Sequence, residues 1–170
     1  MKTLSLSKFF LGCALLASSC KPAQDSKLPV LGNPVTEQGV TREHTIRPFQ
    51  YLSQDSTVVT NDSLANGIYI ADFFFTSCPS ICPRVMKQML RLHDEFKNVK
   101  GVKLVSFTLD PKRDTVGKLS MYAENLGVSP NKWLFLTGDK DFTLDLADDF
   151  FVVALEDPSA PGGFDHSGKI

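Results

Sequence analysis

The fold of this chain is decided by residues 68–83, which read IYIADFFFTSCPSICP. The first eight of these residues are nearly all apolar, as expected for a strand that is buried on both faces. Two cysteines follow, Cys78 and Cys82, each with a proline directly after it. Apolar residues at helical spacing then continue to Phe96, which predicts an amphipathic helix with Pro83 in its first turn. The sequence therefore predicts a strand, a two-cysteine loop and a helix in direct succession.

The rest of the domain repeats this alternation of strands and helices. After the first strand and helix, the patterns predict a strand over 102–109, a helix from Asp114 to a stop at Gly127, a strand over 133–137, a helix over 141–149 and a strand over 150–154. Such alternation is typical of an α/β domain whose parallel sheet carries helices on its faces. Ligands in these domains bind beyond the carboxyl ends of the strands, where the cysteine pair lies. We therefore predict a thioredoxin-like fold.

Both ends of the domain carry additional patterns. Short extended segments at 28–32, 44–49 and 57–60 are separated by glycine, proline, asparagine and aspartate, which predicts an N-terminal β-hairpin extension. Residues 165–170 resemble the opening of another strand. We expect a last strand and a terminal helix to be missing from the sequence after Ile170.

Residues 1–20 are typical of an export signal, because a basic start precedes an apolar stretch that is too short to span a bilayer. Their end resembles a lipoprotein box in which Cys20 becomes the lipid-modified first residue, although Ala17 stands where leucine is usual. The alternative is ordinary cleavage that leaves Cys20 as a spare thiol. Residues 21–27 are polar and resemble a tether, and 28–170 form the domain. We expect an exported, membrane-anchored lipoprotein that faces the periplasm, with the inner membrane favoured.

The composition agrees with one globular domain behind a leader. The chain has 170 residues, is 42% hydrophobic and carries a formal net charge of −1. The chain has no surplus of basic residues, so its charge does not indicate nucleic acid as a partner. We expect Cys13 to leave with the signal and Cys20 to be blocked by lipid, which makes Cys78 and Cys82 the free thiols of the mature chain.

The pair could form a disulfide or hold a metal ion. A purely structural disulfide is disfavoured, because closing so short a loop removes little entropy from the unfolded chain. A helix N-terminus lowers a thiol pKa, and the resulting thiolate serves both metal binding and nucleophilic attack. The wider CxxxC spacing and the imidazole of His166 favour a site with two sulfurs and one nitrogen. Such a site suits Cu(I) or Cu(II), and zinc if a fourth ligand is present.

Three motifs in order resemble the Sco/SenC/PrrC family: residues 73–83, 106–115 and 165–167. The resemblance implies a membrane-tethered, thioredoxin-fold copper chaperone for the assembly of cytochrome c oxidase. It implies one copper per domain, held by Cys78, Cys82 and His166, with Asp110 as an acidic residue near the ligands. The implied partner is the oxidase subunit that carries the CuA centre, with other copper chaperones or thiol–disulfide reductants as further partners.

Two other functions use the same residues differently. A thiol–disulfide reductase that keeps the oxidase cysteines reduced would need Cys78 and Cys82 but not His166. A peroxide-reducing protein is a weaker alternative, because Thr76 precedes Cys78 by two positions rather than the usual three. Our leading hypothesis is a metallochaperone rather than an enzyme that turns over substrate.

The remaining histidines and methionines have ordinary explanations. We expect His44 at the surface and His93 at the edge of the core. Met86 and Met89 share the helical spacing of the apolar face, which indicates core packing rather than copper binding.

Overall fold

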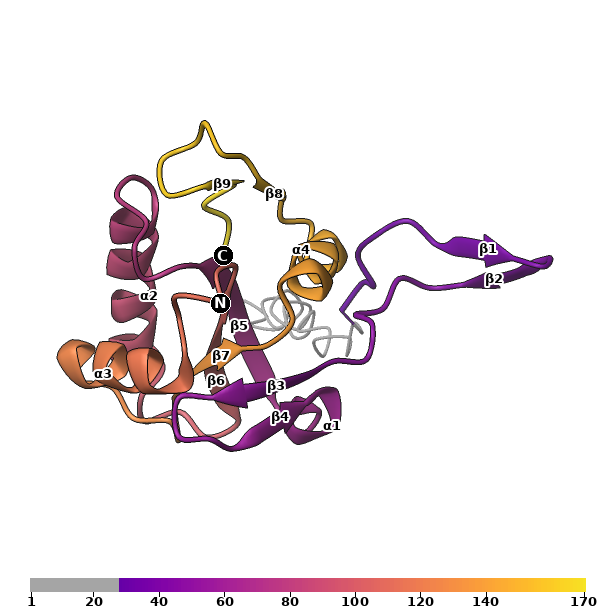
Figure 1. Ribbon diagram of the computed structural model, residues 1–170. Helices are drawn as coiled ribbons and strands as arrows, with labels where there is room; N and C mark the ends of the chain where they lie inside the picture. Colours follow the sequence, from indigo (N-terminus) through magenta and orange to yellow (C-terminus); the bar gives the residue numbers. More distant parts are fainter. Residues whose placement is uncertain (1–27) are drawn as a thin grey trace, which may run out of the picture.

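The computed structural model describes residues 28–170, and its centre is a mixed sheet with the strand order β4-β3-β7-β6-β5 (Figure 1). Its strands are β3 (Gln50–Ser53), β4 (Val58–Thr60), β5 (Ile68–Phe74), β6 (Val102–Thr108) and β7 (Trp133–Thr137). The helices are α1 (Asn61–Leu64), α2 (Cys82–Phe96), α3 (Val116–Leu126) and α4 (Lys140–Asp149). Two further strand pairs lie outside this sheet, β1 (Val35–Glu37) with β2 (Val40–Arg42) and β8 (Ala154–Glu156) with β9 (Phe164–His166). No helix in this part of the chain is long and apolar enough to cross a membrane.

The parallel strands β5, β6 and β7 confirm the predicted core of the fold. They lie side by side in the same order as in the sequence, with Ile68 opposite Val102 and Leu104 opposite Trp133. Since crossovers between parallel strands are right-handed, α2 and α3 cover one face of the sheet. Figure 1 shows α4 on the opposite side. The carboxyl ends of β5 and β6 therefore meet at one edge, where the cysteine loop begins.

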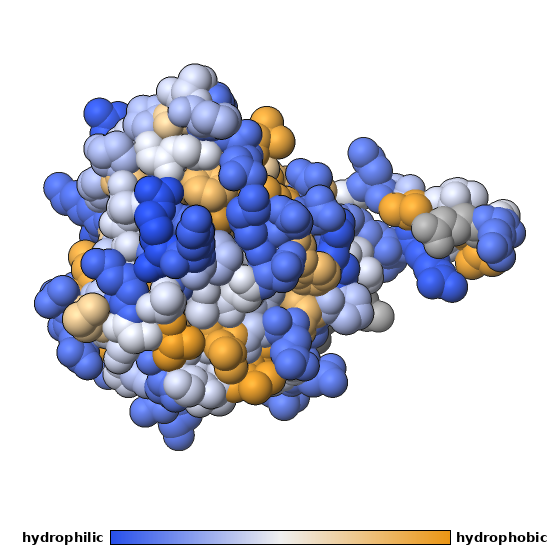
Figure 2. Space-filling model, viewed as in Figure 1, coloured by the Kyte–Doolittle hydropathy of each residue, from blue (hydrophilic) through white to orange (hydrophobic). Residues whose placement is uncertain are grey.

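The amino-terminal segment forms two hairpins rather than one. The β1–β2 pair projects from the body as an arm, on which Val35 and Val40 are exposed (Figures 1 and 2). The β3–β4 pair extends the central sheet instead, because β3 lies antiparallel to β7. The predicted extended segment at 57–60 corresponds to β4, whereas 28–32 and 44–49 are not strands.

The strand predicted at 150–154 was placed too early. The turn that ends α4 occupies Phe150 and Phe151, and Phe151 has a positive φ of 57°. Backbone N–H groups of Phe150 and Val152 both donate to the carbonyl of Ala147, which closes the helix end. Strand β8 begins only at Ala154, so the apolar character of this segment comes from a helix terminus.

The core contains one buried polar network among its aromatic side chains. The indole N–H of Trp133 donates to Ser106 Oγ over 2.8 Å, and the Ser106 hydroxyl donates to Asp72. These three residues come from β7, β6 and β5, and all are fully buried. Burial raises the pKa of the Asp72 carboxyl to about 7, although the Ser106 hydrogen bond opposes this effect. The second Asp72 oxygen has no partner within residues 28–170.

Candidate metal centre

The cysteine loop is held at the junction of β5 and α2. Strand β5 ends at Phe74, and the Cys78 N–H donates to the Phe75 carbonyl over 3.2 Å. Helix α2 begins at Cys82, with Pro83 in its first turn as predicted. Both cysteines are buried and free of a disulfide. The local sequence therefore places two thiols at a helix N-terminus, with Cys82 inside the helix.

His166 reaches the cysteines from the other end of the chain. It is the last residue of β9 and pairs with Ala154 of β8. Two close approaches fix this segment over the cysteine loop. A Cβ atom on Gly162 would lie 2.5 Å from the Phe75 ring, and one on Gly168 would lie 2.7 Å from the Ile81 side chain. Glycine is therefore required on both sides of His166 for the backbone to come this near.

The three predicted ligands converge on one point. His166 Nε2 lies 3.8 Å from Cys78 Sγ and 3.5 Å from Cys82 Sγ, and all three ligand atoms lie within 4.8 Å of one another. Metal–sulfur and metal–nitrogen bonds of about 2.3 and 2.0 Å separate two donors on one ion by roughly 3.5–3.7 Å. The Cys82 sulfur–nitrogen separation lies in this range, and the Cys78 separation of 3.8 Å exceeds it only slightly. The donor set therefore suits a soft ion with two sulfurs and one nitrogen as ligands.

The imidazole is oriented by packing on its other side. The Phe75 ring meets the His166 ring edge to face at a centroid distance of 5.6 Å. His166 Nδ1 is buried and has no hydrogen-bond partner within residues 28–170. Nε2 is consequently the nitrogen that faces the two sulfurs.

The two thiols differ strongly in acidity. Burial by itself raises the pKa of Cys78, but hydrogen bonds from His166 and from the backbone N–H groups of Cys82 and Ser80 lower it to about 6. Burial raises the pKa of Cys82 well above its ordinary value, and the nearby Cys78 thiolate adds to this effect. Without metal, Cys78 is the thiolate and Cys82 the thiol at neutral pH.

Asp110 lies outside the group of three ligands. Its carboxylate forms an ion pair with Arg113, whose guanidinium also donates to the Gly162 carbonyl over 2.7 Å. Gly162 is the residue that packs against Phe75. Asp110 is therefore connected to the site through Arg113 and the segment that carries His166. The sequence suggested a role for Asp110 but did not indicate Arg113.

Asp114 is a buried residue of this region whose sequence context predicted only the start of a helix. It accepts hydrogen bonds from the Thr76 backbone N–H at 2.9 Å, the Thr76 hydroxyl at 2.5 Å and the Thr108 hydroxyl at 2.6 Å. Its side chain is fully buried. Asp114 therefore fixes the loop two residues before Cys78. Its place in the 106–115 motif was the available indication.

The other sequence predictions have mixed outcomes. Met86 and Met89 are buried in the core, as predicted, and His93 is half-buried with its ring 6.0 Å from that of Trp133. His44 is held by a 2.8 Å hydrogen bond between its Nε2 and the Asp149 carbonyl. The predicted signal of residues 1–20, with Cys13 and Cys20, and the tether of residues 21–27 lie outside the described residues.

A thioredoxin-like domain in which two thiols and an imidazole converge at the carboxyl end of the first parallel strand is a thiol-based metal-binding protein. Residues 37–170 match the family model described as SCO1/SenC, and the chain belongs to this family. A curated relative, the SCO1 protein homolog of Bacillus subtilis, is 36% identical over 97 residues. This alignment covers 56% of the chain and 50% of the relative, so the chain spans about half the length of that protein.

Solved structures agree with this assignment. A SCO1/SenC family lipoprotein from Bacillus anthracis has a TM-score of 0.65 at 26% identity, over 72% of this chain and 73% of that one. BsSco, described as a member of the Sco family of cytochrome c oxidase assembly proteins with a disulfide switch, has a TM-score of 0.60 at 31% identity, over 68% of both chains. Copper-bound ScoI of Arabidopsis thaliana has a TM-score of 0.59 at 28% identity, over 72% of this chain and 77% of that one. The predicted family and fold are confirmed.

Proposed function

We propose that this protein is a copper metallochaperone that delivers one copper ion to the CuA centre of cytochrome c oxidase during assembly. The observation that carries the proposal is the convergence of Cys78, Cys82 and His166 within 4.8 Å of one another. Copper-bound ScoI and the oxidase-assembly role given for BsSco support copper as the cargo and the oxidase as its destination.

The acidity of the two thiols gives a mechanism for loading and release. Cys78 is already a thiolate near neutral pH and is ready to take up the ion. Cys82 must lose a proton when it becomes a ligand, so loading releases a proton and becomes more favourable as the pH rises. Release to the acceptor proceeds by exchange of one ligand at a time, and the returning Cys82 proton favours the empty site.

The redox state of the pair decides whether the site can be filled. Oxidation of Cys78 and Cys82 to a disulfide by an external oxidant takes two electrons and the Cys82 proton from the pair, and it removes both sulfur ligands. His166 alone cannot hold a soft ion tightly. An external dithiol must therefore reduce the disulfide before the next copper ion is loaded.

A second candidate function, a thiol–disulfide reductase for the oxidase cysteines, is favoured by the lowered pKa of Cys78. A thiolate near neutral pH is the attacking form in disulfide exchange. This function needs both cysteines but no metal ligand from β9.

One experiment separates the two functions. The copper-loaded full chain is mixed with the soluble CuA-bearing subunit, and the appearance of the CuA spectrum is followed, beside the reduction of that subunit's disulfide by the copper-free chain. For the metallochaperone, the wild type transfers copper and His166→Ala does not. Disulfide reduction that His166→Ala retains belongs to the reductase, and it is slowed only as far as the pKa of Cys78 rises without the His166 hydrogen bond. Transfer at the wild-type rate by His166→Ala contradicts the proposal, and His44→Ala serves as the matched histidine control.

We also propose that the protein acts at the periplasmic face of the inner membrane, held by lipid on Cys20. The support is the sequence of residues 1–20 together with the family lipoprotein of Bacillus anthracis. Radiolabelled palmitate should enter the wild-type protein and not a Cys20→Ala variant. Equal label in both would contradict the anchor, while copper binding should be the same in both.

A further inference from the structure

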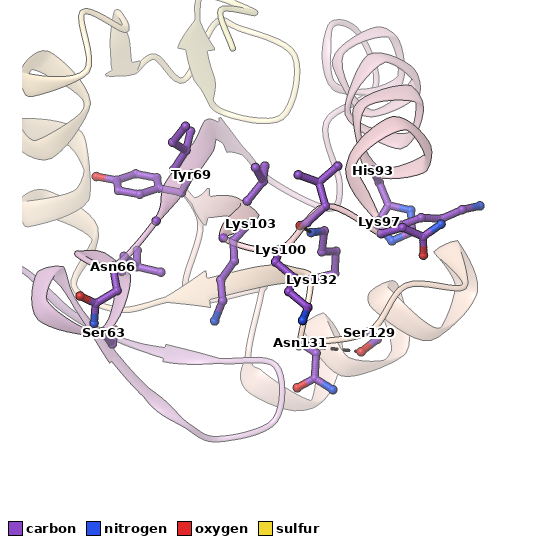
Figure 3. Close-up of a pocket in the computed structure, with 17 residues that line it drawn as sticks. Ser63, Asn66, Tyr69, His93, Lys97, Lys100, Lys103, Ser129, Asn131 and Lys132 are labelled. Atoms are coloured by element: carbon purple, nitrogen blue, oxygen red, sulfur yellow. Dashed lines mark hydrogen bonds between the residues drawn. The ribbon is translucent and has the colours of Figure 1, made fainter. Parts of the chain in front are cut away.

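A second cavity lies at the end of the sheet that the metal site does not use. Its volume is about 580 Å³, and it is formed where β5 and β6 begin, with the end of α2 beside them (Figure 3). Cys78 follows the carboxyl end of β5, whereas Ile68 at the cavity starts this strand. The two sites therefore lie at opposite edges of the sheet and can be occupied at the same time.

The lining of this cavity is basic. Four lysines contribute to it, and none of its lining residues is an aspartate or a glutamate. They come from three separate places in the chain: the end of α2 and the turn after it (Lys97, Lys100), strand β6 (Lys103) and the residue before β7 (Lys132). Since the whole chain has a net charge of −1, the composition does not account for this local surplus.

Most of this charge is not neutralised within residues 28–170. Lys97 forms an ion pair with Asp94 at 3.3 Å, and the Lys132 ammonium donates to the Val99 carbonyl over 2.6 Å. Lys100 and Lys103 have no carboxylate or hydrogen-bond partner in this part of the chain. Figure 3 shows Lys100, Lys103 and Lys132 around the middle of the cavity, with Lys97 at the side of α2. Like charges held near one another repel, and a bound anion relieves that repulsion.

The neutral groups in the lining also suit an anion. Asn66, Asn131 and Ser129 place amide and hydroxyl groups around the cavity, and these groups can donate hydrogen bonds to oxyanions (Figure 3). Lys103 and Lys132 are half-buried, so their stems are held by packing while their ammonium groups remain available. A volume near 580 Å³ is within the usual range of about 300–1,000 Å³ for small-molecule sites.

We propose that this cavity binds a phosphate-bearing anion, with Lys100, Lys103 and Lys132 as the charged contacts. Lysine ammonium groups bind phosphate as point charges, and three of them around one cavity match a group that carries more than one negative charge. The same chemistry is found in a free phosphate compound and in the headgroup of an anionic phospholipid. The site is separate from copper binding, so its occupation does not require Cys78, Cys82 or His166.

The test compares two double variants of the full chain that lose the same charge. Lys100→Gln with Lys103→Gln alters the cavity, and Lys112→Gln with Lys118→Gln alters exposed lysines elsewhere. Binding of pyrophosphate is measured by calorimetry at constant ionic strength. Binding to vesicles is measured by sedimentation with phosphatidylcholine alone or mixed with phosphatidylglycerol. Far-UV circular dichroism checks that both variants are folded.

The cavity variant should bind pyrophosphate at least tenfold more weakly than the wild type, and the control variant should bind as the wild type does. A matching loss of sedimentation with phosphatidylglycerol vesicles identifies the headgroup as a source, whereas a loss of pyrophosphate binding alone identifies a free phosphate compound. Absence of binding in both arms, or equal weakening in both double variants, would overturn the proposal.

Discussion

The strongest structural prediction concerns Asp114, which holds the loop before Cys78. Replacement by alanine removes three hydrogen bonds to a buried carboxylate and leaves the Thr108 hydroxyl and the Thr76 N–H without that acceptor. Hydrogen bonds to charged groups contribute about 1.5–3 kcal/mol each, and an unpaired buried donor costs about 1–3 kcal/mol. Because Thr76 is only half-buried and can reach water, we expect Asp114→Ala to lower the free energy of unfolding by about 3–5 kcal/mol.

The assay is urea unfolding of the reduced, metal-free protein, with Asp139→Ala as the matched control. Asp139 caps α4 through one exposed hydrogen bond to the Phe142 N–H at 2.8 Å, so its loss should cost about 1 kcal/mol. Copper affinity should also fall about 10- to 100-fold in Asp114→Ala, as for other groups that orient metal ligands. A loss of stability no larger than that of Asp139→Ala, together with wild-type copper affinity, would refute this reasoning.

Three further predictions follow from the groups around the site. Alkylation of Cys78 in the reduced, metal-free protein, followed by mass spectrometry, should show a midpoint near pH 6. The pKa of the Cys78 thiol in the folded protein lies below the unfolded value of 9.0. Ionisation of Cys78 therefore stabilises the folded protein above pH 9, and this contribution is lost as the pH falls towards 6. The effect of pH on stability has the opposite sign for Asp72, because burial raises its pKa from 3.8 to about 7, so that stability falls as the pH rises between these values. In urea unfolding, Asp72→Asn should therefore gain more stability over the wild type at pH 8 than at pH 4. An equal gain at both pH values would contradict this. Gly162→Ala should weaken copper binding and destabilise the protein by about 1–3 kcal/mol, because alanine is strained at φ +87° and its Cβ would clash with the Phe75 ring. Gly163→Ala is the control, because φ is +92° there but no atom lies near the added Cβ. In the same urea and copper titrations it should show only the smaller effect of backbone strain.

Local patterns predicted the elements around the metal centre well. The apolar run of β5, the cysteine loop and α2 are adjacent in the chain, so their order was visible without long-range information. The ends of α3 were also predicted correctly, because Thr115 accepts a hydrogen bond at its start and Gly127 takes the left-handed conformation at its end. Even His166 was recognisable, through the order of the three motifs.

Contacts between distant segments were not predictable in the same way. The pairing of β3 with β7 joins residues such as Leu52 and Thr137, and neither segment carries a local pattern that specifies its neighbour. The partners of Asp114 and the bridge from Arg113 to Gly162 likewise depend on the folded arrangement of β6 and the segment before β9. For a charged residue in a loop, the sequence alone does not show whether the side chain is solvated or buried.

The central claim is tested most directly by copper titration of the reduced full chain. We predict one copper per chain and, for Cu(II), an intense thiolate-to-copper absorption that is lost in Cys78→Ser, Cys82→Ser and His166→Ala. The control variant His93→Gln, whose ring lies at the far end of α2, should bind copper as the wild type does. Wild-type stoichiometry, affinity and absorption in His166→Ala would contradict the three-ligand copper site.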